Sequence, residues 1–469
     1  MLEALRNAFL LPELRKRILF TIFILVIYRL VAHIPVPGVN VEVLRTIQQS
    51  IEAGQAGGLG NLVSLLSLLS GGAVNNFSVL AMGVYPYVTA QLIVQLLIPV
   101  IPRLTEWSKE GDAGRRKMNR LTYFATVPMA MLNAIGQVNI FEQIGQQVTG
   151  GATRVLPNWG FVPAENILPT LVTVITMTAG TMFAIWLGEL ITEQGIGQGL
   201  SIIIFGGIVS RFIFNILNLP QQATDTAQGI LSVVVFFAIL ILTIVAIVYI
   251  SEGERRVNVQ YGRRVRGRRM MGGVDTYVPL KVNTTGMIPL IFAQAMLVFP
   301  AVIAGFFINS PNAATQTFAS EIVRFFTGSR TGSAGTVLGY AALYFLMVVA
   351  FTYFYTDVVM QQQNLAENLQ KQGGFIPGIR PGRTTENFIN KITRRLTLVG
   401  ALFLGALAIM PYIITALSQI PGLAFLTPLG SNSSLISGAG LLIVVGVVLD
   451  TMRQLEAQLM MRRYEGFIK

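Results

Sequence analysis

Residues capable of acid, base or nucleophilic chemistry are few in this sequence and lie far apart. The chain has no cysteine and one histidine, His33, which stands beside Pro35 and Pro37. No His-Glu-x-x-His, Gly-x-Gly-Asp or Walker-type glycine motif occurs. The prominent acidic residues fall near the ends of apolar segments: Glu189, Glu193, Glu252, Glu254, Asp357 and Asp450. The sequence therefore predicts a protein that is not an enzyme and that holds no metal or cofactor.

The apolar segments themselves are the dominant feature. Of the 469 residues, 53% are hydrophobic and only 12% are charged, which is typical of an integral membrane protein. A helix rises 1.5 Å per residue, so about twenty apolar residues cross a hydrocarbon core of about 30 Å. The sequence predicts an all-α integral membrane protein with ten transmembrane helices, at 18–34, 77–98, 121–140, 167–188, 200–217, 230–250, 287–308, 337–356, 396–414 and 435–449.

The positive charges are distributed asymmetrically between the two sides of these spans. The segments on one side contain 28 of the 34 lysines and arginines, and those on the other side contain 4. By the positive-inside rule, both termini are cytosolic in a multi-pass protein. Because five is odd, a second set of five spans starts on the opposite side from the first. We therefore expect two inverted halves, 1–217 and 218–469, with a central pathway between them.

Residues 57–98 do not fit an ordinary membrane helix. The apolar run at 59–70 reaches only about 18 Å, and glycines flank it on both sides. A half-length helix at membrane depth needs protein or water around it, which predicts a short re-entrant helix at 57–72. The glycines favour a displaceable plug; a static packing helix or an interfacial helix is the alternative. Its apolar side chains are Leu59, Leu62, Val63, Leu65, Leu66 and Leu69.

Two long basic segments, 251–283 and 357–395, lie on the predicted cytosolic side. The first alternates β-branched residues around a basic turn and is typical of a projecting hairpin. The second presents a glycine-proline turn. Their arginines can determine the topology and attract anionic lipid headgroups. A projecting hairpin, however, holds its tip beyond the Debye length of about 8 to 10 Å over which the surface potential fades, so a soluble acidic or nucleic-acid partner fits these arginines better. The arginines are Arg263, Arg264, Arg266, Arg268, Arg269, Arg380 and Arg383.

Five ordered segments resemble a known family. They are SGGAVNNFSVLAMGVYPYVTAQLIVQLL at 70–97, ITEQGIGQGLSIIIFGGIV at 191–209, VPLKVNTTGMIPLIFAQAMLVFP at 278–300, GGFIPGIRPG at 373–382 and GLLIVVGVVLD at 440–450. The chain resembles the SecY family, the channel-forming subunits of the bacterial Sec protein translocase. The resemblance implies a protein-conducting channel that moves unfolded preproteins across the cytoplasmic membrane and inserts membrane proteins laterally into it.

The resemblance also implies roles for particular residues. The spans at 77–98 and 287–308 would flank a lateral gate, and the helix at 57–72 would be the plug. The basic hairpin would meet the ribosome, including its rRNA, or the SecA motor ATPase, with Arg380 supporting motor-driven transport. Further implied partners are the SecE and SecG small subunits, preprotein signal sequences and membrane lipids. The implied pore ring is Val84, Val88, Leu200, Ile204, Ile291 and Ile443.

The ring departs from the family pattern at three places. The family's ring is rich in isoleucine, whereas this chain has Val84, Val88 and Leu200. Aliphatic residues at helical spacing are common in any membrane protein, so spacing alone does not single out these six. Two other functions fit the same broken stretch. One is a secondary solute transporter with discontinuous helices, and the other is a scaffold for membrane insertion.

Overall fold

The computed structural model describes residues 11–52, 63, 67, 70–98, 100–149, 153–160, 164–218, 226–261, 264–266, 269–271, 275–305, 307, 312–326, 334–418 and 438–465. Each of the ten predicted spans overlaps one helix. These helices are α2 (Pro12–Val31), α5 (Tyr85–Leu97), α7 (Asp112–Thr149), α8 (Ile167–Gln194), α9 (Gly199–Asn218), α10 (Thr226–Glu252), α11 (Ile288–Gly305), α13 (Ala334–Gln363), α15 (Arg383–Ser418) and α17 (Gly438–Glu465).

Length and composition agree with a membrane protein. Among the described residues, six helices are long and apolar enough to cross a bilayer: α7, α8, α10, α11, α13 and α15. A seventh span results if α5 is counted together with α6 (Pro102–Lys109), to which it is joined through a bend of 105°. Proline opens both of these short helices at their first turn, where its missing N–H costs nothing.

The prediction of one continuous span at 77–98 is wrong in its first third. Residues 70–84 form a series of turns, and α5 begins only at Tyr85. The backbone enters the left-handed region at Phe77, with φ of 43°, and at Gly83, with φ of 52°, which interrupts a helix. The main chain of this segment instead pairs with the end of α2, where the N–H of Val36 donates to the carbonyl of Phe77 at 3.0 Å.

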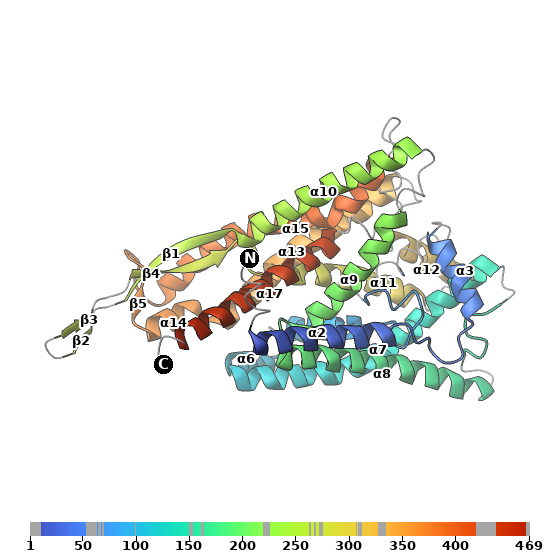
Figure 1. Ribbon diagram of the computed structural model, residues 1–469, viewed down its shortest axis with the longest axis horizontal. Helices are drawn as coiled ribbons and strands as arrows, with labels where there is room; N and C mark the ends of the chain where they lie inside the picture. The colour runs from blue at the N-terminus through green and yellow to red at the C-terminus, as the bar shows by residue number, and fades with distance from the viewer. Residues whose placement is uncertain are drawn as a thin grey trace.

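The helices form two groups (Figure 1). Helices α2, α7 and α8 lie along one side of the molecule, and α10, α13 and α15 lie along the other. Contacts of α9 with α17, and of α11 with α5 and α7, join the two groups. The short helices α3 (Val41–Glu52) and α12 (Ala313–Phe326) lie at one end of the molecule, and α6 lies at the opposite end. A 3-10 helix at Ala164–Asn166 precedes α8.

A small sheet extends from the same end as α6 (Figure 1). Strand β1 (Glu254–Tyr261) pairs antiparallel with β4 (Asp275–Lys281), and β2 (Arg264–Arg266) pairs with β3 (Arg269–Met271), which confirms the predicted hairpin. A third strand, β5 (Gly374–Phe375), comes from the other basic segment and pairs with β1; the sequence did not predict it. The sheet and α14 (Leu365–Lys371) are joined by an apolar core of Val257, Val259, Leu280, Leu369, Ile376, Ile389 and Ile392.

Candidate pore and basic platform

The six predicted ring residues come from four helices and meet in one hydrophobic cluster. Val84 is the N-cap residue of α5, and Val88 follows one turn later. Leu200 and Ile204 share a face in the first turns of α9, while Ile291 and Ile443 belong to α11 and α17. Four of them belong to one buried cluster with Tyr28, Leu80 and Phe292, and Val88 and Leu200 pack against that cluster. The structure thus brings together residues that are up to 359 positions apart in sequence.

Most of the ring side chains are removed from the surface. Val84 is 2% exposed, Ile204 5%, Ile291 7% and Ile443 1%, whereas Val88 and Leu200 are half-buried. Their side chains contain only aliphatic carbon, so they make no hydrogen bonds to a molecule that passes between them. A constriction of this kind excludes water and ions through unfavourable wetting.

Glycines set the position of α9 at the ring. A Cβ at Gly188 of α8 would come within 2.6 Å of Cδ2 of Leu200, and a Cβ at Gly199 would overlap the carbonyl of Gly188. The two backbones therefore approach more closely than residues with side chains allow. Close approach through small residues is the usual way in which membrane helices pack. Here it fixes the first turn of α9, from which Leu200 and Ile204 project.

Part of the predicted plug lies within the described residues. Val63 and Ser67 are helical and are both completely buried. Val63 belongs to an apolar cluster with Val74, Phe77 and Phe141, so this point of the segment lies inside the helix bundle. The predicted plug residues Leu59, Leu62, Leu65, Leu66 and Leu69 lie outside the described part of the chain.

The predicted lateral gate corresponds to a seam between α5 and α7 on one side and α11 on the other. Small side chains line part of it, since Ala130 and Ala134 of α7 share a cluster with Ala301 and Ala304 of α11. Near the end of the seam, Nε2 of Gln143 donates to the carbonyl of Gly305 at 3.1 Å. Both features join α7 to α11.

The arginines of the two basic segments belong to one body. We call the sheet, the β2–β3 hairpin and α14 the basic platform. Arg264 and Arg266 lie in β2, Arg269 opens β3, and Arg263 and Arg268 lie outside the described residues. Arg380 and Arg383 are exposed, and Arg383 is the first residue of α15. The strand pairing of β5 with β1 connects the two groups of arginines, and the hydroxyl of Tyr261 donates to Oε1 of Gln372 at 3.3 Å.

Ion pairs order the surface of the basic platform. Nε of Arg256 lies 2.8 Å from Oε1 of Glu254, and the Arg256 guanidinium stands 4.7 Å from the centre of the Tyr277 ring. On α14, Nζ of Lys371 lies 2.8 Å from Oε1 of Glu367, and this hydrogen bond lowers the pKa of the Glu367 carboxyl below its usual value. In the part of the chain that the structure describes, Arg380 and Arg383 are exposed and belong to neither of these pairs.

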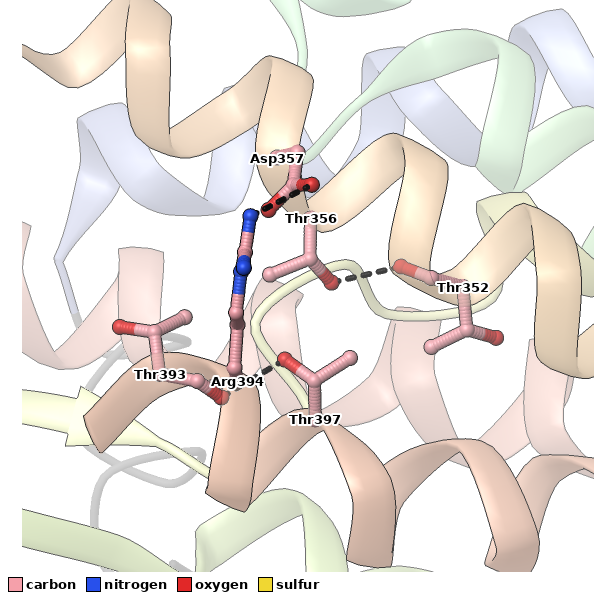
Figure 2. Close-up of polar contacts among 6 residues, drawn as sticks. All are labelled: Thr352, Thr356, Asp357, Thr393, Arg394 and Thr397. Carbon is pink, nitrogen blue, oxygen red and sulfur yellow. Dashed lines mark hydrogen bonds and ion pairs between the residues drawn. The ribbon is translucent and has the colours of Figure 1, made fainter. Parts of the chain in front are cut away.

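Figure 2 shows polar contacts of α13 and α15, the two helices that flank the second basic segment. Nη2 of Arg394 on α15 lies 3.9 Å from Oδ2 of Asp357 on α13, at the root of the second basic segment. Below this pair the two helices pack through four buried threonines. Three of these hydroxyls donate to carbonyls of their own helix, Thr352 to Val348, Thr356 to Thr352 and Thr397 to Thr393, so they behave as small packing residues.

Sequence reasoning missed one polar contact near the ring. Arg29 lies in the predicted first span, and no role follows for it from the sequence. In the structure its Nη1 donates to the carbonyl of Gly71 at 2.7 Å, and its Nη2 donates to the Ser210 hydroxyl. A charged residue inside an apolar span is itself a signal of function, and that signal could have identified Arg29.

Known proteins resemble this chain over its whole length. The family model described as SecY matches residues 78–452. The protein translocase subunit SecY of Halalkalibacterium halodurans is 39% identical over 476 residues, covering 100% of both chains. The protein translocase subunit SecY of Thermus thermophilus is 40% identical over 468 residues, covering 100% of this chain and 98% of that one.

Solved structures share the fold. One described as "The structure of a protein conducting channel" has a TM-score of 0.56 at 18% identity, covering 94% of this chain and 91% of its own. Sec61 in a canine ribosome-channel complex has a TM-score of 0.53 at 17% identity, with the same coverage. Together with the overlap of the ten predicted spans with helices, these matches confirm the predicted membrane fold. The chain belongs to the SecY family.

Proposed function

We propose that this chain is the channel-forming subunit of a protein translocase. It conducts unfolded preproteins across the cytoplasmic membrane and releases apolar segments sideways into the lipid. One observation carries the proposal: six aliphatic residues from α5, α9, α11 and α17 converge in one cluster. Such a collar seals against ions while making no directional contact that would retain a passing chain.

The plug and the seam support the same mechanism. Val63, within the proposed plug at 57–72, is buried in the bundle. Displacement of this segment would open the path past Val84, Val88, Leu200, Ile204, Ile291 and Ile443. The α5–α11 seam would then serve as the lateral gate. Segments of the preprotein would enter the lipid or remain in the channel according to their free energy of transfer into the bilayer. At the centre of a membrane helix, one Arg or Asp costs about 2.5 to 3.5 kcal/mol, whereas one Leu stabilises the inserted helix by about 0.5 kcal/mol.

The basic platform supports a role for external energy sources. It lies at the end of the molecule where the chain is most basic, which by the positive-inside rule is the cytosol. Arg264, Arg266, Arg269, Arg380 and Arg383 would bind the ribosome, including its rRNA, or a SecA motor. Small subunits of the SecE and SecG type would complete the assembly, and both termini would be cytosolic.

The test uses the purified chain in vesicles with its small subunits, a motor ATPase and a preprotein. The expected result is ATP-dependent protection of the preprotein from added protease. Crosslinking identifies the residues that the preprotein passes. Probes at Val88 and Ile291 should capture a stalled preprotein, whereas a probe at the exposed Phe124 should not. Gradient-driven uptake of a small solute without preprotein protection would instead favour a solute transporter.

A further inference from the structure

Arg29 connects three parts of the chain that are distant in sequence. It lies in the last turn of α2, where a positive charge also complements the helix dipole. Its guanidinium donates through Nη1 to the carbonyl of Gly71 at 2.7 Å and through Nη2 to the hydroxyl of Ser210 on α9. Gly71 lies at the C-terminal end of the proposed plug at 57–72, so the side chain joins the end of that segment to α2 and α9.

A second side chain of α2 holds the neighbouring carbonyl. The hydroxyl of Tyr28, which is 2% exposed, donates to the carbonyl of Ser70 at 2.9 Å. Two consecutive carbonyls of the turn are therefore fixed by two consecutive residues of α2. The bond from Arg29 is charge-assisted and is the stronger of the two types.

Helix α9 closes the other side of the turn. A Cβ added at Gly71 would come within 2.8 Å of the Cα of Gly207, and one added at Gly207 would overlap Gly71. Gly71 also has φ of 65°, a conformation that L side chains rarely adopt. The backbone of the turn is therefore pressed against bare helix backbone, while its carbonyls face the α2 donors.

From this geometry we infer that Arg29 is a positioning residue, which anchors the C-terminal end of the plug in the resting channel. The inference rests on the proposed function. Arg29 is outside the aliphatic ring, so it acts through the turn at Ser70 and Gly71. The strength of its hydrogen bonds sets how readily a signal sequence displaces the plug.

Because the chain contains no cysteine, a single introduced thiol can be labelled selectively, which gives a direct test. Val63→Cys places a single thiol at a fully buried position, and its reaction with a membrane-impermeant maleimide reports exposure of the plug. Adding Arg29→Met should raise the reaction rate about 10-fold, whereas Arg29→Lys should raise it less because one donor group remains. The matched control is Arg45→Met, which removes an exposed arginine of α3 and should leave the rate unchanged.

Two smaller substitutions keep the test valid if Arg29→Met fails to fold. Tyr28→Phe and Ser210→Ala each remove one hydroxyl with little change of volume, and each should raise the rate about 3-fold. An unchanged rate in the folded Arg29→Met protein, or in both hydroxyl variants, would overturn the inference.

A measurement of preprotein transport distinguishes failure of this inference from failure of the proposed function. With a weakened signal sequence, Arg29→Met should transport about 10-fold more preprotein than the unsubstituted chain. If neither protein transports anything but the thiol becomes reactive, the channel proposal fails and the anchor remains. If the unsubstituted chain transports preprotein and the thiol stays protected in Arg29→Met, the anchor alone fails.

Discussion

The pore ring and the basic platform present opposite kinds of surface. The ring joins α5, α9, α11 and α17 through aliphatic carbon, and its contacts have no preferred direction. An apolar core and strand pairing hold the basic platform together, and its surface presents exposed arginines. A surface that must release every side chain needs non-directional contacts, whereas a surface that selects a partner needs charge and fixed geometry. The comparison predicts that a substitution in one region impairs the function of that region and leaves the function of the other unchanged.

The largest effect is expected from a polar group in the ring. Ile443→Asn or Ile204→Asn buries an amide among aliphatic side chains, which favours wetting of the constriction. We expect ion leak through reconstituted channels to rise roughly 100-fold, the equivalent of about 3 kcal/mol, and signal-sequence selectivity to relax. Conductance across a planar bilayer measures the leak, with Ile443→Leu as control. Normal leak and normal selectivity in both asparagine variants would show that these residues do not form the seal.

A charge reversal on the basic platform should have a smaller and separate effect. Arg380→Glu places a negative charge where an acidic partner binds, and we expect motor-driven transport to fall about 10-fold. At high salt, the difference in transport between Arg380→Glu and the unsubstituted chain should be smaller, because exposed charges are screened. Ion leak should stay normal, since Arg380 is remote from the ring cluster. Arg324→Glu on α12, at the opposite end, is the control. Equal transport by Arg380→Glu and the unsubstituted chain would contradict the assignment.

A conservative substitution in the apolar core of the basic platform should lower the local stability of the platform without unfolding it. Ile376 is 5% exposed and packs beside β5, so Ile376→Val should destabilise the platform locally by about 1 kcal/mol. Faster hydrogen exchange at the β1 amides that pair with β5 would report the change. Unchanged exchange at Tyr261 and Gln260 would mean that β5 does not stabilise β1.

The smallest effect is expected at the root of the basic platform. The Asp357–Arg394 pair is 3.9 Å long and more than half of each side chain is exposed, so Asp357→Asn should cost less than about 0.5 kcal/mol. Thermal unfolding of the detergent-solubilised protein measures it. A larger loss would mean that the pair, and not the buried threonines, holds α13 to α15 at this point.

The sequence predicted most of the fold because its apolar runs are long and its charges are asymmetric. The six predicted ring residues, singled out only through the family resemblance, lie in or against one hydrophobic cluster, and their role as a pore ring stays a prediction. The start of α5 was missed because Phe77 and Gly83 adopt left-handed conformations that an apolar run does not reveal. Strand β5 was missed because two residues carry no periodicity, and its partner lies more than a hundred positions earlier. The Arg29 contact depends on which carbonyls the turn presents, which only coordinates supply.

Strand β5 has a mechanical consequence. It ties the loop bearing Arg380 to β1, and the carbonyl of Gly253 after α10 accepts from the N–H of Val282, just before α11. Gly400 of α15 packs against the same point, since a Cβ there would lie 2.7 Å from the carbonyl of Val282. We therefore expect a force applied at Arg380 to reach the segment that precedes α11, the helix that carries Ile291. Binding of a partner at the basic loops would then be coupled to the position of that helix.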